Sequence, residues 1–138
     1  MQGIKIGLAE DHQKFRDVLK MILAFTPDLD LVIVANNGKE LLDKMEFTEV
    51  DVLLLDNNMP VLNGMDTLKI LKNDYPFVKT IIMSSNNEYE VVRKYAQLGA
   101  NSYLLKNTDY QILVATIKSV HAFGISPSDM FHATQKMA

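Results

Sequence analysis

Five short apolar runs, separated by longer segments of helical period, constrain the fold more than any other feature of this sequence. The run Val52–Leu55 is apolar at every position, as expected of a strand that is covered on both faces. Five strand–helix units predict a parallel sheet with helices on both faces, because each parallel crossover needs a covering helix. The runs are Ile4–Ala9, Leu29–Asn36, Val52–Leu55, Ile81–Ser84 and Ser102–Leu105, and the clearest helical stripe is Phe15, Val18, Leu19, Ile22 and Leu23.

Polar residues and a glycine indicate where some of the helices begin and end. Asn37 with Glu40, and Thr108 with Gln111, have the spacing of capping boxes. Gly99 follows the fourth predicted helix, at the position of a C-terminal cap glycine.

Length and composition indicate one domain without a cysteine-based site. A chain of 138 residues, of which 48% are hydrophobic, can bury a substantial core as a single unit. The periodic pattern covers residues 1–123, whereas residues 124–138 lack it and are interpreted as a tail or the stub of a linker. Because the sequence has no cysteine, disulfides, thiolate catalysis and cysteine-ligated zinc are excluded.

Charge and hydropathy argue against two classes of partner. The formal net charge of −3 gives no electrostatic reason to expect that this chain itself binds nucleic acid. No stretch approaches the roughly 18 apolar residues of a transmembrane helix, and the N-terminus lacks a signal-peptide pattern. We therefore expect no membrane association and a cytoplasmic location, which the lack of cysteine also suits.

Carboxylates, a hydroxyl and an ammonium group stand at the carboxyl ends of the predicted strands. Glu10 and Asp11 follow the first strand, and Asp56 follows the third. Ser84 ends the fourth strand, and Lys106 follows the fifth. Because ligands of open parallel sheets bind at the carboxyl ends of the strands, we expect these side chains to converge on one edge.

The expected carboxylate cluster favours phosphoryl chemistry assisted by a metal ion. Clustered carboxylates repel one another, so the group must hold either a proton or a cation. Without histidine or cysteine ligands, all-oxygen ligation favours a hard ion, and Mg²⁺ fits best. A carboxylate beside a metal ion and a lysine is a plausible nucleophile toward phosphorus. Mg²⁺, Lys106 and a hydroxyl such as that of Ser84 would each neutralise one phosphoryl oxygen.

The same strand ends resemble the receiver domains of response regulators. The motifs are Glu10-Asp11, the run Leu54–Pro60 followed by Gly64, Ser84, and the run Tyr103–Lys106. The resemblance covers about residues 4–123. Asp11–Arg16 and Gly99–Lys106 are most similar to the subfamily that carries a C-terminal LuxR-type helix-turn-helix output domain, which is not expected within this chain. The resemblance implies a flavodoxin-like, doubly wound α/β fold of strand order 2-1-3-4-5, with five helices on two faces.

The resemblance implies that Asp56 is the phosphoacceptor. Glu10 and Asp11 would hold Mg²⁺ together with Asp56 and the backbone carbonyl of Asn58. Glu10 stands where aspartate is commoner in the family, which lengthens one ligand arm by a methylene group. Lys106 would contact the phosphoryl group.

The resemblance also implies a switch. Ser84, in place of the commoner threonine, would move to hydrogen-bond the phosphoryl group, and Tyr103 would change its rotamer in response. Asn58 and Asn86 occupy the two positions that tune the rate of dephosphorylation in this family.

Partners follow from the same resemblance. The donor would be a phosphohistidine on a sensor histidine kinase or phosphotransfer protein, or a small acyl phosphate. The chain would not be an enzyme beyond catalysing its own phosphorylation and dephosphorylation. Phosphorylation would change a surface, and with it the affinity for an unidentified output partner or for a second copy of the chain. That surface would include Tyr89, Tyr95, Tyr103 and Tyr110, although packing of the ring under a helix is the simpler interpretation of each tyrosine taken singly.

Three other functions account for parts of the pattern. A degenerate receiver would keep the fold and act as a phosphorylation-independent protein-binding module. A phosphohydrolase of the haloacid dehalogenase type would need Asp-x-Asp after the first strand, where this chain has Glu10-Asp11-His12. A flavin or nucleotide carrier would need a glycine-rich phosphate loop, which the sequence does not contain. Taken singly, Asp11 could be a helix cap and Lys106 a solvated charge.

Overall fold

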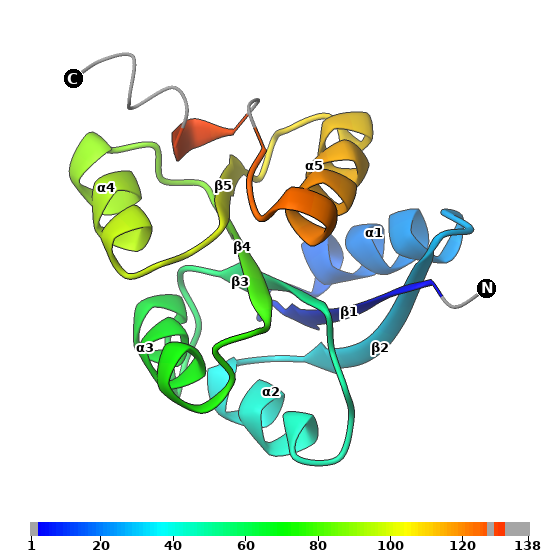
Figure 1. Ribbon diagram of the computed structural model, residues 1–138, viewed down its shortest axis with the longest axis horizontal. Helices are drawn as coiled ribbons and strands as arrows, with labels where there is room; N and C mark the ends of the chain where they lie inside the picture. Colours follow the sequence, from blue (N-terminus) through cyan, green and yellow to red (C-terminus); the bar gives the residue numbers. More distant parts are fainter. Residues whose placement is uncertain (1–2, 127–128, 132–138) are drawn as a thin grey trace.

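The computed structural model describes residues 3–126 and 129–131, which form five parallel strands and five helices joined by loops (Figure 1). The strands follow the order β2-β1-β3-β4-β5, and every neighbouring pair is parallel. The predicted doubly wound α/β fold and its strand order are therefore confirmed. The elements are β1 (Ile4–Ala9), α1 (Gln13–Ala24), β2 (Leu29–Ala35), α2 (Gly38–Met45), β3 (Val52–Asp56), α3 (Gly64–Asp74), β4 (Lys79–Ser84), α4 (Tyr89–Gln97), β5 (Ser102–Leu105) and α5 (Tyr110–Phe123).

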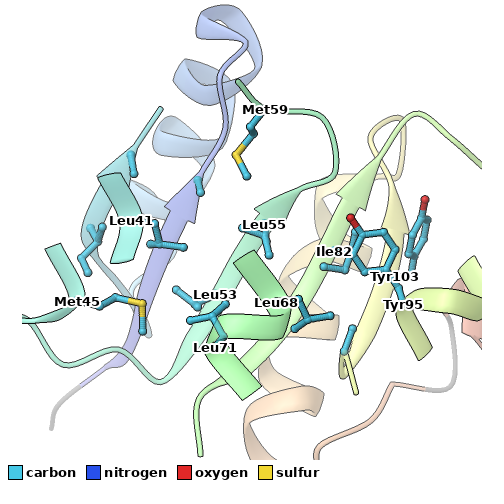
Figure 2. Packing of buried hydrophobic residues seen from close by; sticks show 14 of the residues in the cluster. Leu41, Met45, Leu53, Leu55, Met59, Leu68, Leu71, Ile82, Tyr95 and Tyr103 are labelled. Carbon is cyan, nitrogen blue, oxygen red and sulfur yellow. The ribbon is translucent and has the colours of Figure 1, made fainter. Parts of the chain in front are cut away.

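The helices cover the sheet on both faces, α1 and α5 on one and α2, α3 and α4 on the other (Figure 1). Alternate residues of β3 point to opposite faces. Val52 and Leu54 pack with α1 and α5, whereas Leu53 and Leu55 pack with the other three helices. Figure 2 shows the packing around Leu53 and Leu55. Both faces of this central strand are buried, which explains why its first four residues, Val52–Leu55, are all apolar.

The apolar runs give the strand positions to within about two residues. β1 and β5 match their predicted bounds, and β2 ends one residue earlier than predicted. β3 extends to Asp56, and β4 begins at Lys79, two residues before the predicted start. The α1 stripe is only partly correct, because Leu19 and Leu23 are buried whereas Val18 is 52% exposed.

Two of the predicted helix ends are confirmed in part or in full, and one is wrong. The Asn37 side chain caps α2 by accepting from Glu40 N at 2.9 Å, but the Glu40 carboxylate accepts from Asn36 N instead of completing the box at Asn37. Gly99 follows α4 with φ of +93°, a left-handed conformation that glycine adopts without steric cost.

The predicted capping box of Thr108 and Gln111 is wrong, because α5 begins one residue later. The cap of α5 is Asp109, whose carboxylate accepts from Gln111 N at 3.0 Å. The Thr108 backbone N–H instead donates to Leu105 O, in the turn that follows β5.

The carboxyl ends of the three central strands and of β5 meet at one edge of the sheet. The loops after β1, β3, β4 and β5 begin there, so this edge brings together residues that are far apart in the sequence. No helix within the described ranges has the length and apolarity needed to cross a membrane.

Candidate functional site

Charged side chains from β1, β3 and β5 converge at the carboxyl edge of the sheet. Lys106 Nζ lies 2.7 Å from Glu10 Oε1 and 3.2 Å from Asp56 Oδ1. Glu10, Asp11 and Asp56 each contribute a carboxylate oxygen to a group whose members lie within 4.8 Å of one another. Ser84 is the last residue of β4 at the same edge. The structure thus brings together the residues that the sequence predicts for this site.

The backbone after β1 fixes Glu10 and leaves Asp11 at the rim. Glu10 N donates to Ala35 O at 3.0 Å, and the Glu10 carbonyl accepts from Arg16 Nη1 at 2.9 Å. One carboxylate oxygen of Glu10 accepts from His12 N at 3.1 Å. The cap of α1 is His12, whose Nδ1 accepts from Phe15 N. Asp11 is therefore not the helix cap, and its exposed side chain stands beside the two buried carboxylates.

The negative charge of Asp56 is only partly balanced by its neighbours. Asp56 is 4% exposed and Glu10 is 1% exposed, so neither carboxylate is well solvated. Burial and the neighbouring Glu10 raise the pKa of Asp56 to about 7, although Lys106 acts in the opposite direction. One ammonium group thus lies against a cluster of three carboxylates, whose negative charge a further cation could balance.

Lys106 is held as a cation by its neighbours. Burial alone lowers the pKa of Lys106, but the contacts with Glu10 and Asp56 outweigh burial and raise the pKa above its ordinary value. Its ammonium group also lies 5.0 Å from the centre of the Phe15 ring, within the range of a cation–π contact.

The loop between β3 and α3 is anchored at Asn57, the residue after Asp56. Gly64 N donates to Asn57 O at 3.0 Å, and the Tyr95 hydroxyl of α4 donates to Asn57 Oδ1. A Cβ atom at Gly64 would lie 2.3 Å from Asp56 O and 2.9 Å from the Tyr95 hydroxyl, so only glycine allows this approach. Asn58, expected to offer its carbonyl to a metal ion, lies exposed in this loop.

Asn86 connects the two predicted switch residues through its backbone. Ser84 Oγ accepts from Asn86 N at 3.0 Å, and the Tyr103 hydroxyl donates to Asn86 O at 2.6 Å. Ser84 itself accepts at its backbone oxygen from Lys106 N at 2.9 Å. A displacement of Ser84 would therefore act on the same short loop that holds the Tyr103 hydroxyl.

The four tyrosines of the predicted surface divide into two pairs, and only one pair is exposed. Tyr89 and Tyr110 are 37% and 55% exposed, but Tyr95 and Tyr103 are fully buried. Figure 2 shows the Tyr95 and Tyr103 rings side by side, with centroids 5.7 Å apart. The prediction that Tyr95 and Tyr103 contribute directly to a surface is wrong for this arrangement. Sequence reasoning also missed the link from Tyr95 to Asn57, for which the sequence carries no local signal.

A hard divalent cation fits the donor set. Glu10 Oε1 is buried and makes the ion pair with Lys106, but it has no hydrogen bond to any described residue. The carboxylate cluster offers only oxygen ligands, and exposed Asp11 keeps one side open to water. Mg²⁺ binds through one or two carboxylates and retains several waters, which matches this half-open arrangement.

Comparison with known proteins identifies the family. The family model of the response regulator receiver domain matches residues 6–118. The chain belongs to this family. Receivers of response regulators take phosphoryl groups from kinases, and they are generally phosphoacceptors rather than enzymes.

Its relatives include regulators of the LuxR and NarL type. The chain is 35% identical over 117 residues to the transcriptional regulatory protein DegU of Brevibacillus brevis, covering 85% of this chain and 50% of that protein. It is 33% identical over 116 residues to the nitrate/nitrite response regulator protein NarL of Escherichia coli K12, covering 84% of this chain and 52% of that protein. The chain therefore spans about half the length of these relatives.

A solved structure confirms the fold. The signal receiver domain of the putative response regulator NarL from Mycobacterium tuberculosis superimposes with a TM-score of 0.84 at 22% identity. The superposition covers 89% of this chain and 99% of that one.

Proposed function

We propose that residues 1–123 form a receiver of two-component signalling that accepts a phosphoryl group on Asp56. The observation that carries the proposal is the ion pair of buried Asp56 with Lys106, beside the carboxylates of Glu10 and Asp11. The donor would be the phosphohistidine of a sensor histidine kinase or phosphotransfer protein, which places the reaction in the cytoplasm. Residues 124–138 would be a tail or linker stub, of which Asp129–Phe131 pack against the receiver core.

The transfer itself requires little from the protein beyond position and charge. A carboxylate oxygen of Asp56 attacks phosphorus, the new O–P bond forms, and the N–P bond to the donor histidine breaks. Lys106, already an ion-pair partner of Asp56, neutralises one oxygen of the transferred group. The Ser84 hydroxyl accepts from Asn86 N and still has its own proton to donate to another phosphoryl oxygen.

Glu10, Asp11, Asp56 and the Asn58 carbonyl would hold Mg²⁺ in this site. The ion would supply positive charge where phosphoryl oxygens gather. Without it, the three carboxylates repel the incoming dianionic group, and Lys106 alone cannot balance them. Asn58, exposed two residues after Asp56, and Asn86, in the loop after β4, would tune the access of hydrolytic water.

The proposed output is a change in affinity for a partner or for a second copy of the chain. A phosphoryl group adds charge and acceptor oxygens that draw Ser84 toward Asp56. Because Ser84 and the Tyr103 hydroxyl both bind the backbone of Asn86, such a movement reaches the inside of the α4–β5 region. Tyr89 is the tyrosine of α4 exposed on the outside.

Covalent labelling tests the proposal. Incubation with acetyl phosphate and Mg²⁺ should add one phosphoryl mass that is labile to base and is absent from Asp56→Asn, because an amide is not a nucleophile toward phosphorus. Asp66→Asn, an exposed aspartate at the start of α3, is the matched control and should be labelled like the wild type. Full labelling of Asp56→Asn would refute the assignment of Asp56, and an unlabelled wild-type chain would favour the degenerate, binding-only receiver.

A further inference from the structure

A short C-terminal segment, Asp129–Phe131, packs against the inner face of β5 and α4. We call these three residues the strap. The Ser102 hydroxyl of β5 donates to Asp129 Oδ2 at 2.7 Å, and both residues are buried. Met130 and Phe131 pack against the core cluster on the α2–α3–α4 face of the sheet. The strap lies beyond residues 6–118, to which the receiver family model matches.

The strap contacts the predicted switch residue itself. The ring of Phe131 lies 6.1 Å from the ring of Tyr103, at an angle of 48°. On its other side Tyr103 contacts Tyr95, with ring centroids 5.7 Å apart at 58°. Both arrangements are tilted aromatic pairs of the kind that stabilise a packed core. Tyr103 is thus held between a ring of α4 and a ring of the strap.

The two core tyrosines reach both loops of the phosphoacceptor site. The Tyr103 hydroxyl binds Asn86 O in the loop after β4, and the Tyr95 hydroxyl binds Asn57 Oδ1, one residue after Asp56. The contact between Phe131 and Tyr103 requires the buried rotamer of Tyr103. If the Tyr103 ring turned outward, it would leave both Tyr95 and Asn86 and would lose its packing against Phe131.

We propose that the strap is an intramolecular clamp that stabilises the inward rotamer of Tyr103 and thereby favours phosphorylation of Asp56. This inference rests on the proposed function, in which Ser84 moves toward the phosphoryl group and acts on the Asn86 loop that holds the hydroxyl of the inward Tyr103 ring. The coupling is reciprocal: a docked strap increases affinity for the phosphoryl group, and a phosphoryl group tightens the strap.

Titration with beryllofluoride and Mg²⁺, followed by amide NMR shifts of residues 84–88, tests the coupling. Phe131→Ala should weaken beryllofluoride affinity about five- to tenfold, at the lower end of ordinary allosteric coupling. Phe131→Leu, which keeps apolar bulk, should recover part of the loss. Phe47→Ala removes a phenyl ring that is 87% exposed and should leave the affinity unchanged. Equal affinity of Phe131→Ala and wild type, or tighter binding by Phe131→Ala, would overturn the proposal.

Two further measurements separate failure of the clamp from failure of the phosphoacceptor. Intact mass after acetyl phosphate treatment reports labelling of Asp56 independently of the strap, and Phe131→Ala should still reach full labelling. Amide hydrogen exchange without any phosphoryl analogue should be faster in β5 and in residues 85–88 of Phe131→Ala than of the wild type. If exchange there is unchanged, the strap does not hold Tyr103 and the inference is wrong, whatever the labelling shows.

Discussion

At the scale of single residues, the environment of Asp56 disfavours the charged form of its carboxyl group. This group is buried, it faces Glu10, and its pKa is raised to about 7 despite the ion pair with Lys106. This excess of negative charge is what a bound divalent cation would compensate. The residue that is proposed to perform the chemistry should therefore weaken the metal-free fold.

This cost predicts a pH dependence of stability in the absence of divalent metal. Below the ordinary pKa of 3.8 the Asp56 carboxyl is protonated in both the folded and the unfolded chain, so its raised pKa does not lower the free energy of unfolding. Between that value and about pH 7 the unfolded chain ionises first, so wild-type stability falls as pH rises. Asp56→Asn lacks this titrating carboxyl. From pH 4 to pH 8 its free energy of unfolding should therefore rise by about 2–4 kcal/mol relative to that of the wild type.

Urea denaturation in EDTA at both pH values measures the difference. Asp66→Asn, in the exposed first turn of α3, serves again as the control and should follow the wild type. A loss of stability in Asp56→Asn that is the same at both pH values would instead identify Asp56 as a structural ion-pair partner of Lys106.

Asp11 carries a second prediction, for metal affinity. Its side chain is exposed at the rim of the acidic cluster, so truncation removes a ligand without opening a cavity. Asp11→Ala should raise the Mg²⁺ dissociation constant at least about tenfold, because even outer-shell partners of metal ligands cost 10–100-fold. Isothermal titration with Mg²⁺ measures the dissociation constant. Asp17→Ala, at an exposed position of α1, is the control. Unchanged affinity together with a lower melting temperature would make the acidic pair structural.

At the scale of elements, the sequence predicts strands better than it predicts helix ends. A strand buried on both faces leaves a continuous apolar run, which a single sequence displays directly, as in β3. The α5 boundary was missed because Thr108 and Asp109 are both good caps, and the turn after β5 takes the Thr108 N–H. Nothing local distinguishes those two choices.

The candidate site was predictable for a similar reason, and its inner connections were not. Strand ends in a parallel sheet meet whatever their distance in sequence, so Glu10, Asp56 and Lys106 could be placed together from topology alone. The contacts of Tyr95 with Asn57 and of Phe131 with Tyr103 depend on how helices and a terminal segment pack over the sheet. Such packing leaves no period or motif in the sequence.

The junction of α2 with the β3–α3 loop gives a prediction at this scale. Gly38 N donates to Leu62 O, and a Cβ atom at Gly38 would lie 1.8 Å from Thr67 Oγ1 and 2.9 Å from Leu62 O. Gly38→Ala should destabilise the protein by about 1–2 kcal/mol, because the clash exceeds the gain in helix propensity. Thermal or urea melts measure the change, and Lys39→Ala, exposed in the same turn, should be nearly neutral. A more stable Gly38→Ala would mean that α2 and α3 separate easily.

At the scale of the whole molecule, the two faces of the sheet have different relations to the site. The core of the α2–α3–α4 face contains Leu55, Tyr95 and Tyr103, which adjoin Asp56, Asn57 and Asn86 through the chain or through hydrogen bonds. The core of the α1–α5 face consists of aliphatic side chains together with Phe15 of the site rim. A change at Asp56 therefore has polar connections through Asn57 and Asn86 to the buried tyrosines of α4 and β5. Two arrangements that differ by a few kcal/mol suffice for a switch along this path.

Ser84 is the first residue on that path, and its substitution should separate phosphorylation from its readout. Ser84→Ala removes the acceptor of Asn86 N and the donor proposed for the phosphoryl group, but leaves Asp56, Lys106 and the acidic cluster in place. Labelling by acetyl phosphate should stay within about threefold of wild type, because Lys106 supplies most of the neutralising charge. Amide exchange on adding beryllofluoride should change across α4 and β5 in the wild type and in Ser85→Ala, the exposed neighbour used as control. In Ser84→Ala the change should be confined to the loop that follows Asp56. If exchange in α4 and β5 responds equally in Ser84→Ala and Ser85→Ala, the signal reaches Tyr103 by another route, and the link through Asn57 and Tyr95 becomes the one to break next.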